Sequence, residues 1–411
     1  AVVLVEDGRE RAFRSGEHFV WNTGGRSALR DFAGQALFAG TAALAQGALA
    51  GRASLDGQVL VVLGTLGEHA AELVPDWIRR GAEGLVLLVP DPRDFALHAR
   101  SRGPARLFVD APVDDPVWQS DLPTLIAGPA LAAALLAGTT IPPDALDGRR
   151  PFAALPLGRA LRATIRAEVR DVAAANVAAL VPGRDPARRP EVVAYTAHYD
   201  HLGTSTPDER GDSIYNGFSD NAAGVAMLLA IADALRRDPP ARSALFLFFT
   251  GEERGLLGSS YYVSAPLVPL ERTVAVINLD AGAPPAPPRR WRVAGGTLST
   301  LGELAARTAA RFGWTAEPSG ARPNSDYWPF LRRGVPAAFL IPGQEWDGVS
   351  REERERLRQR WDRYHQPDDE WAADFPWAGL ERYARLALEL GRVVAEAPDR
   401  PRMLEPPPGT R

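Results

Sequence analysis

"VVAYTAHYDHLGT", residues 192–204, is an apolar segment that ends in three polar side chains, His198, Asp200 and His201. Its first residues are β-branched or aromatic, which is typical of a buried strand, and the glycine and polar residues that follow indicate a loop. Two histidines and a carboxylate are costly at the end of a buried strand unless something binds them. Open α/β sheets bind their ligands at the carboxyl ends of the strands, so this segment predicts a binding site at a sheet edge.

Further apolar strands are expected along the chain at 243–251, 273–281 and 335–343, with segments of helical periodicity between them. Strands that alternate with helices predict an α/β fold. We therefore expect a mostly parallel or mixed central sheet with helices on both faces.

The amino-terminal part of the chain differs in character from the rest. We predict a smaller, non-catalytic module over residues 1–150, either α/β or β-rich, a catalytic domain over 151–400 and a flexible tail over 401–411. Three of the six histidines lie in this module without a plausible metal-binding partner nearby, namely His18, His69 and His98. A lone histidine is usually a surface residue or a satisfied core residue.

The composition excludes several kinds of chemistry. The chain of 411 residues has no cysteine, which excludes thiol nucleophiles, thiolate zinc sites and disulfides. All 47 basic residues are arginine, so lysine Schiff bases, pyridoxal-phosphate attachment and the phosphate-loop lysine are excluded as well. The formal net charge of -4 predicts no surface for nucleic acid or for an anionic membrane.

The localisation is predicted only in outline. No stretch reaches the roughly 18–20 unbroken apolar residues that span a bilayer, so we expect no membrane-spanning segment. The chain starts at Ala1 instead of methionine. We expect an exported protein, secreted or periplasmic, whose signal peptide is not part of this chain, with a cytoplasmic location as the alternative.

Acidic residues and one more histidine follow the other predicted strands. "FFTGEERG" places Glu252 and Glu253 just after a run of phenylalanines, and "AVINLDAG" places Asp280 at the end of the next strand. "FSDNAAG" places Asp220 before a helix, and "RYHQPDDEW" places His365 in a loop. Each has an ordinary structural explanation when taken alone, such as a helix N-cap for the aspartate of "FSDNAAG" and solvated loop charges for the two glutamates.

Taken together, these residues favour a metal site. Neighbouring strands would bring several carboxylates to one edge, where they repel one another unless a cation is present. Two histidines and three carboxylates can hold two divalent ions that share one carboxylate. Imidazole with carboxylate suits zinc, with cobalt or manganese possible. Asp200 can orient the imidazole of His198 from behind, and one glutamate is left over as a base, which describes two-metal hydrolysis.

Six motifs occur in the order found in one family: "HYDHLG", "SDNAAG", "GEERG", "NLDAG", "NSDYWPF" and "YHQPDDEW". The sequence resembles the zinc aminopeptidases related to bacterial leucyl aminopeptidase and aminopeptidase S. That family also includes plasma glutamate carboxypeptidase, membrane glutamate carboxypeptidase and glutaminyl cyclases. The resemblance covers about Asn176 to Glu370, and residues 1–150 resemble a protease-associated domain, a common insertion in the family.

The resemblance implies a role for each residue of the site. His198 and Asp280 would hold one Zn²⁺, Glu253 and His365 the other, and Asp220 would bridge the two ions. Glu252 would be the general base, with Asp200 behind the first histidine. Asp326, Tyr327 and Tyr364 are candidates for substrate binding, the tyrosines because some members stabilise the oxyanion with a tyrosine.

This chain departs from the family at one position of the histidine motif, where Asp368 replaces the familiar serine. The leading hypothesis is a metallo-exopeptidase that hydrolyses the amino-terminal peptide bond of peptides, through a water activated by two zinc ions. Three alternatives remain: a glutaminyl cyclase with one zinc, a carboxypeptidase or dipeptidase, and a non-enzymatic receptor-like domain. The complete ligand set, "SDNAAG" in place of an Asp-Asp-Lys-Gly bridge, and the absence of lysine favour the aminopeptidase. The sequence does not predict the oligomeric state.

Overall fold

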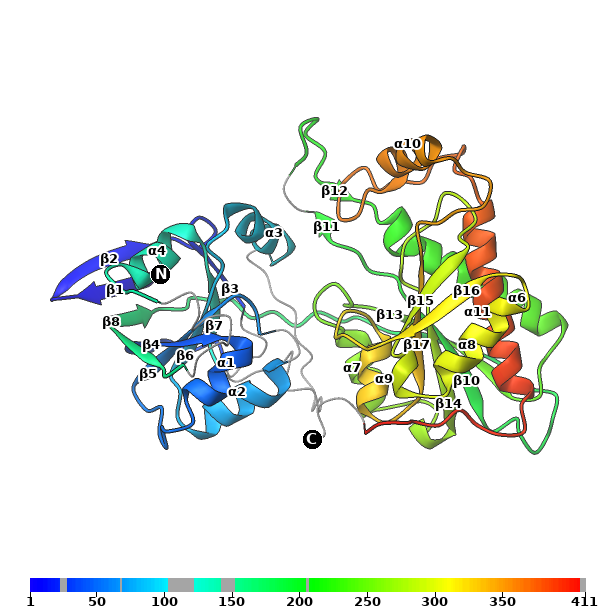
Figure 1. Ribbon diagram of the computed structural model, residues 1–411, viewed down its shortest axis with the longest axis horizontal. Helices are drawn as coiled ribbons and strands as arrows, with labels where there is room; N and C mark the ends of the chain where they lie inside the picture. The colour runs from blue at the N-terminus through cyan, green and yellow to red at the C-terminus, as the bar shows by residue number, and fades with distance from the viewer. Residues whose placement is uncertain (23–27, 67–68, 103–121, 142–151, 205–206, 407–411) are drawn as a thin grey trace. The chain divides into compact units, whose positions relative to one another are not determined.

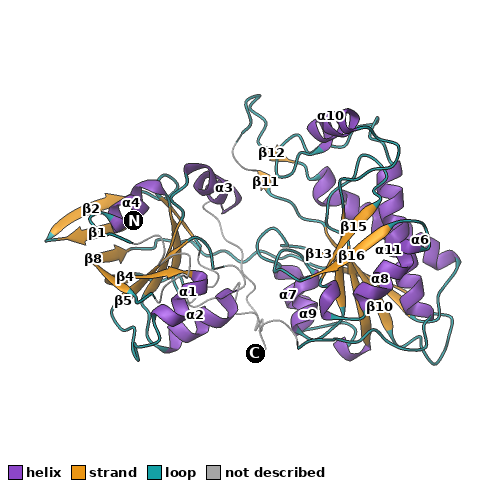
Figure 2. Ribbon diagram, viewed as in Figure 1, coloured by secondary structure: helices purple, strands orange, loops and turns teal. Residues whose placement is uncertain are grey.

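The computed structural model describes the whole chain except residues 23–27, 67–68, 103–121, 142–151, 205–206 and 407–411. The chain divides into two compact units, Ala1–Val172 and Ala173–Arg411. Figure 1 follows the chain through both units, and Figure 2 shows that each of them combines helices with strands. The predicted α/β class is confirmed.

The first unit is built around an eight-stranded mixed sheet with the strand order β2-β1-β8-β4-β5-β6-β7-β3. Its strands are β1 (Val2–Glu6), β2 (Arg9–Phe13), β3 (Phe19–Trp21), β4 (Phe32–Thr41), β5 (Gln58–Leu63), β6 (Gly84–Leu88), β7 (Thr124–Ala127) and β8 (Leu155–Ala163). Strands β4 to β7 run parallel, and the remaining strands pair antiparallel. Its helices are α1 (Ala42–Ala48), α2 (Ala70–Arg79), α3 (Pro92–Arg102) and α4 (Pro129–Leu136).

Both faces of this sheet are covered, as the uninterrupted apolar strands predict. Along β5, Leu60 and Val62 join the core beneath α1 and α2, whereas Val59 and Val61 join a second core that includes α4. Successive side chains of a strand point to opposite faces, so a strand buried on both faces must be apolar throughout.

The two units meet in sequence after Val172, later than the predicted boundary at 150. The reason is β8, which pairs antiparallel with β1 and β4 and so belongs to the first sheet. These strands are joined by backbone hydrogen bonds between segments far apart in the chain. Local periodicity carries no information on such a pairing. Residues 142–151, which include the predicted boundary itself, lie outside the described part.

The second unit is built around a seven-stranded mixed sheet with the order β16-β15-β17-β14-β10-β13-β9. The strands are β9 (Val177–Val181), β10 (Val192–His198), β13 (Ser243–Phe249), β14 (Thr273–Asn278), β15 (Arg290–Ala294), β16 (Thr315–Ser319) and β17 (Ala337–Pro342). A short hairpin, β11 (Gly203–Thr204) with β12 (Ile214–Tyr215), stands apart from this sheet. The four central strands β13, β10, β14 and β17 are parallel, so their carboxyl ends meet at one edge.

Helices cover both faces of the second sheet. The covering helices are α6 (Ala223–Arg237), α7 (Leu257–Ser264), α8 (Leu301–Ala310), α9 (Tyr327–Arg332) and α11 (Ala378–Glu396). Helix α10 (Arg351–Trp361) has no buried residue and lies away from the sheet, and η2 (Phe218–Ala222), η3 (Leu270–Arg272) and η4 (Gly296–Leu298) are short helical turns. Helix α11 packs between α6 and α8 on one face, and α7 and α9 pack together on the other, as Figure 1 shows.

Close packing fixes α11 against the central strand β10. The ring of Tyr195 stacks on that of Phe246, with centroids 5.2 Å apart. A Cβ at Gly391 would lie 1.7 Å from the Tyr195 hydroxyl oxygen, so only glycine lets the helix approach this closely. Fully burying a large apolar side chain is worth about 1.5–3 kcal/mol, which makes this interface a major part of the stability of the unit.

One helical stretch among the described residues, Phe218–Arg237, is long and apolar enough to cross a membrane. It consists of η2 and the core helix α6. Met227, Leu228 and Ile231 of α6 are buried in the core that includes the sheet. The apolar character of the stretch is therefore explained by packing within the protein.

Candidate metal centre

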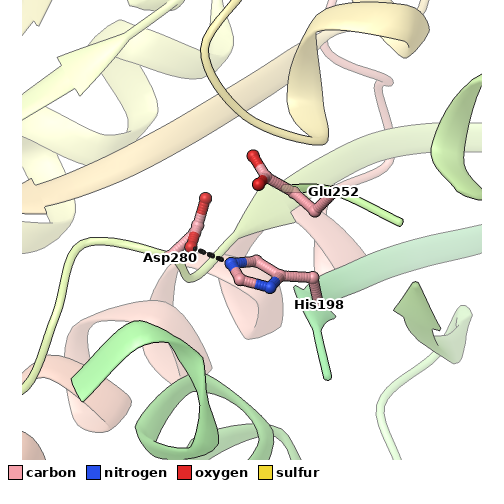
Figure 3. A group of neighbouring side chains, drawn as sticks. All are labelled: His198, Glu252 and Asp280. Atoms are coloured by element: carbon pink, nitrogen blue, oxygen red, sulfur yellow. Dashed lines mark hydrogen bonds and ion pairs between the residues drawn. The ribbon is translucent and has the colours of Figure 1, made fainter. Parts of the chain in front are cut away.

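Three parallel strands deliver the first group of polar side chains to one sheet edge. Strand β10 ends at His198, Glu252 follows β13, and Asp280 follows β14. One potential ligand atom from each of these residues lies within 4.8 Å of the other two. Figure 3 shows their side chains converging, with the interaction between the imidazole and Asp280 drawn as a dashed line. The side-by-side parallel strands are what bring residues more than eighty positions apart together.

The imidazole of His198 lies between two carboxylates. Its Nε2 atom is 2.8 Å from Oδ1 of Asp280 and 3.1 Å from Oδ1 of Asp220. Its Nδ1 atom is 2.9 Å from the backbone oxygen of Asp200, which holds the ring in one orientation. The side chain of this histidine is only 1% exposed.

The other carboxylate oxygen of Asp220 faces a second group. Its Oδ2 atom lies 3.2 Å from Nε2 of His365, and that nitrogen lies 3.3 Å from Oε2 of Glu253. The second oxygen of this glutamate, Oε1, lies 2.8 Å from Nδ1 of His201. Asp220 therefore has one oxygen in each of two adjacent groups of potential metal ligands, which we call groups of donors.

The loop that carries Asp220 is fixed by the loop that carries His365. The carboxylate of Asp369 accepts hydrogen bonds from the backbone N–H groups of Ser219 and Asp220, at 3.0 and 3.2 Å. The Asp369 backbone oxygen also accepts from the N–H group of Phe218, at 2.9 Å. His365 itself has φ of 56°, in the left-handed region that side-chain-bearing residues rarely occupy. Such a conformation persists only where the surrounding structure enforces it.

A buried chain of hydrogen bonds positions Asp280. Its Oδ2 atom accepts from the hydroxyl of Ser325. That hydroxyl accepts in turn from Nδ2 of Asn278 at 2.6 Å, and the amide oxygen of Asn278 accepts from Thr196 at 2.6 Å. The aspartate thus has one oxygen tied to the sheet and the other directed at His198.

The pKa values show how crowded with negative charge this edge is. Burial, with the negative charge of Asp280 added, raises the pKa of Glu252 well above its usual value. Burial likewise raises the pKa of Asp280 and brings that of Asp326 to about 7. Burial works against the charged form of His365, but the carboxylates of Asp220 and Glu253 outweigh it and raise its pKa to about 9. Added positive charge would relieve this repulsion.

These residues fit divalent metal ions. Imidazole nitrogens and carboxylate oxygens are the ligands that zinc takes when cysteine is absent. Two of these potential metal-ligand atoms, Nε2 of His365 and Oε1 of Glu253, are buried and have no hydrogen-bond partner among the described residues. A buried polar atom without a partner costs free energy, which a bound cation would offset.

The comparison with known proteins agrees with this arrangement. The model of peptidase family M28 matches residues 176–391, more than half of the chain. The chain belongs to peptidase family M28. The resemblance seen in the six motifs is thereby confirmed.

Relatives within family M28 are aminopeptidases by name. Aminopeptidase YwaD of Bacillus subtilis is 29% identical over 191 residues, which is 44% of this chain and 36% of that protein. A probable leucine aminopeptidase 2 of Aspergillus oryzae is 30% identical over 190 residues, 43% of this chain and 35% of that protein. The matched region thus spans about a third of the length of these relatives.

Solved structures share the fold. An aminopeptidase from Aneurinibacillus sp. strain AM-1 aligns over 99% of this chain and 82% of its own, with a TM-score of 0.53 and 19% identity. A zinc aminopeptidase from Bacillus subtilis aligns over 97% and 84%, with a TM-score of 0.51 and 18% identity.

The structure places most of the predicted M28 site residues together, but two of them in unexpected ways. Asp200 approaches His198 with its backbone oxygen, whereas its carboxylate Oδ1 is 3.7 Å from the ring and accepts from the N–H group of Glu252 at 3.2 Å. Tyr327 is fully buried and its hydroxyl is hydrogen-bonded to the backbone of Arg322, so this side chain is part of the core. Sequence alone does not reveal whether a backbone or a side-chain oxygen is the nearer partner.

The other two substrate-binding candidates differ in their exposure. Tyr364 is 65% exposed and its ring stacks on that of His365, with centroids 3.8 Å apart. A tyrosine hydroxyl is protonated at neutral pH, so the Tyr364 hydroxyl can donate a hydrogen bond. Asp326 is fully buried next to the network that holds Asp280.

Three residues of the site were given no role from the sequence: His201, Ser325 and Asp369. The signal for His201 was present, because two of only six histidines occur within four residues. Ser325 and Asp369 act through hydrogen bonds to residues far away in the chain, at separations of 45 and 149 positions. No local pattern predicts such contacts.

Proposed function

We propose that this M28 peptidase is a metallo-exopeptidase that removes the amino-terminal residue of peptides. The observation that carries the proposal is the position of Asp220, whose two carboxylate oxygens lie 3.1 Å from His198 and 3.2 Å from His365. A carboxylate shared between two groups of imidazole and carboxylate donors suits two divalent cations side by side. We assign His198 and Asp280 to one cation, Glu253 and His365 to the other, and Asp220 to both.

When bound, two zinc ions would polarise the scissile carbonyl and lower the pKa of an attacking water. The protein supplies the proton transfer. We assign the general base to Glu252, which lies beside His198 and Asp280 at the sheet edge, because Asp220 takes the third ligand position there in our assignment. It would accept the proton of the water and pass it to the amine that leaves, which is worth roughly 10²–10⁴ in rate. Tyr364 is the candidate donor to the developing oxyanion.

The preference for an amino terminus rests on charge. The four carboxylates Asp220, Glu252, Glu253 and Asp280 would balance the charge of two divalent cations, so these residues leave no surplus positive charge for a terminal carboxylate. Two arginines next to the site in sequence are engaged elsewhere. Arg254 donates to the backbone oxygen of Leu202, and Arg363 pairs with Asp368. A carboxypeptidase needs a cationic group for the terminal carboxylate, and these contacts speak against either arginine in that role.

A set of short peptides tests the proposal, with bound metal counted in the same sample. Each peptide is offered with a free or acetylated amino terminus and with a free or amidated carboxyl terminus. We expect two ions per chain and hydrolysis that requires the free amine and tolerates the amide. Hydrolysis that requires the free carboxylate identifies a carboxypeptidase. Ring closure of amino-terminal glutamine identifies a cyclase, and an inert protein with bound metal identifies a receptor-like domain.

Two further expectations concern the role of the first unit and the location of the protein. We propose that residues of the first unit take no part in the chemistry and resemble a protease-associated domain in role, as a spacer or a limit on substrate size. Export of the protein is tested by fractionating the cells that produce it.

A further inference from the structure

His201 lies at the second group of donors without a role in the proposed function. It follows β10, three residues after His198, and its side chain is 7% exposed. The ring is seated against Gly217, where a Cβ would lie 2.7 Å from the ring atom Cγ. Gly217 has φ of 68°, a conformation that glycine adopts without strain. The protein therefore provides a fitted place for this imidazole beside the loop of Asp220.

The distances place Nδ1 of His201 among the donors of the second group. This atom is 2.8 Å from Oε1 of Glu253 and 3.9 Å from Oδ2 of Asp220. The ring lies edge-on to that of His365, with centroids 5.6 Å apart. Zinc ligands lie about 2.0–2.2 Å from the ion, so two donors of one ion are separated by at most about 4.4 Å. Both distances are within that limit.

A shared ion also accounts for the unpartnered atoms of this contact, and one potential ligand atom from each of His201, Asp220 and Glu253 lies within 4.8 Å of the other two. Nδ1 of His201 and Oε1 of Glu253 are 2.8 Å apart, yet neither atom, nor Nε2 of the same ring, meets the geometry of a hydrogen bond with a partner among the described residues. A ring N–H group at this distance donates to a carboxylate oxygen when it is aimed at it. Two ligand atoms that both point at one metal ion can lie close together although neither points at the other, as a hydrogen bond would require. Nε2 of His365, an assigned ligand, has the same property.

We infer that Nδ1 of His201 is a further protein ligand of the second cation, beside Asp220, Glu253 and His365. The inference rests on the two-cation site of the proposed function. Four protein donors fill the usual tetrahedral shell of zinc. The first position has three, from His198, Asp280 and Asp220, which leaves a place for water. The two cation positions would therefore differ in the number of their protein ligands, and the position that includes His201 should bind its ion with the higher affinity.

The test compares metal binding by the full chain and its His201→Ala variant. His365→Ala is the positive control, and His18→Ala, in the first unit, is the negative control. Zn²⁺ affinities are measured by competition with a chelator. Cobalt-substituted samples are then examined by paramagnetic NMR, which counts the shifted N–H signals of metal-bound imidazoles.

We expect the wild-type protein to bind two ions and to show three such imidazole signals. His201→Ala should lose one signal and weaken one ion by more than about 100-fold, beyond what loss of an outer hydrogen-bond partner costs. His201→Asn, which keeps a polar side chain, guards against misfolding and should show the same loss. Two ions with three signals in wild type and an unchanged count in both variants overturn this inference alone. A wild-type protein that binds a single ion overturns the two-cation function and this inference with it.

Discussion

The two units are built on the same kind of sheet and differ in the residues that lie at its edge. Both have a core of four parallel strands whose carboxyl ends meet at one edge. In the first unit, β5, β6 and β7 are followed by Gly64, Val89 and Gly128. In the second unit, the corresponding ends carry His198, Glu252 and Asp280. A parallel sheet therefore offers a place for a site, and the residues at its edge decide whether one is built.

The buried charges of the two units differ in the same way. Arg159 is the one buried charged side chain among the described residues of the first unit. Its terminal nitrogens donate to Glu6 and to backbone oxygens such as that of Leu135. In the second unit, buried atoms of Glu253 and His365 have no such partner among the described residues. Arg159 thus meets a carboxylate and backbone oxygens, and among the described residues only its Nε atom lacks a hydrogen-bond partner, whereas at the metal centre the open atoms are potential metal ligands.

Replacing Asp220 should have the largest effect on the second unit. Asp220→Ala removes the one side chain that faces both groups of donors, so both ions should be lost and peptide hydrolysis abolished. Metal analysis of the purified variant, with turnover measured before and after chelation of the wild type, checks this. A variant that keeps two ions and full activity contradicts the shared role of this residue.

The second prediction separates the neighbours Glu252 and Glu253. Glu252→Gln keeps the shape of the side chain but cannot accept a proton, so both ions should remain while turnover falls by roughly 10²–10⁴. Glu253→Gln replaces an anionic ligand with a neutral one and is the matched control. One ion should then bind more weakly, and excess zinc should restore part of the activity. If the metal loss appears in the first variant and not in the second, the two roles are reversed.

Much of this site was predictable because it follows a rule of sheet geometry. Parallel neighbouring strands bring their ends together, so polar residues after apolar runs, such as His198 and Asp280, predict a cluster. The arrangement of the first sheet was harder to predict, because β8 pairs with β1 across most of the unit. The contacts of His201 and Asp369 were not predictable, since they depend on how loops fold back over the edge.

The third prediction tests one of these loop contacts. Asp369→Asn replaces an acceptor oxygen with a donor group facing the N–H groups of Ser219 and Asp220. The loop of Asp220 should shift, and metal affinity should fall by about 10–100-fold, the usual cost of losing an outer-shell partner. Asp368→Asn is the control, because Asp368 is 40% exposed and pairs with Arg363 at the surface. Equal affinities in the two variants would show that the loop does not need this carboxylate.

The smallest effect is expected in the first unit. Replacing His18, His69 and His98 together by alanine should leave the hydrolysis of a small aminoacyl substrate within about twofold of wild type, because the proposed set of ligands and general base in the second unit is complete without them. The measurement is kcat/KM for that substrate and for a long peptide. A loss for the small substrate as large as that of Glu252→Gln would contradict the division of labour between the units.

The bond between Asp369 and the loop of Asp220 also dictates when the centre can form during synthesis. Asp220 leaves the ribosome long before its backbone amides find their acceptor, which is made 149 residues later. Domains fold from the amino terminus as they are made, so the first unit can be complete while the metal centre is still half built. His198 and Asp280 are both synthesised before His365, which is a proposed ligand of the second cation. At the proposed two-cation site, loading with both ions would thus be a late event, and a ribosome stalled before His365 would hold a chain that lacks one of the ligands of the second cation.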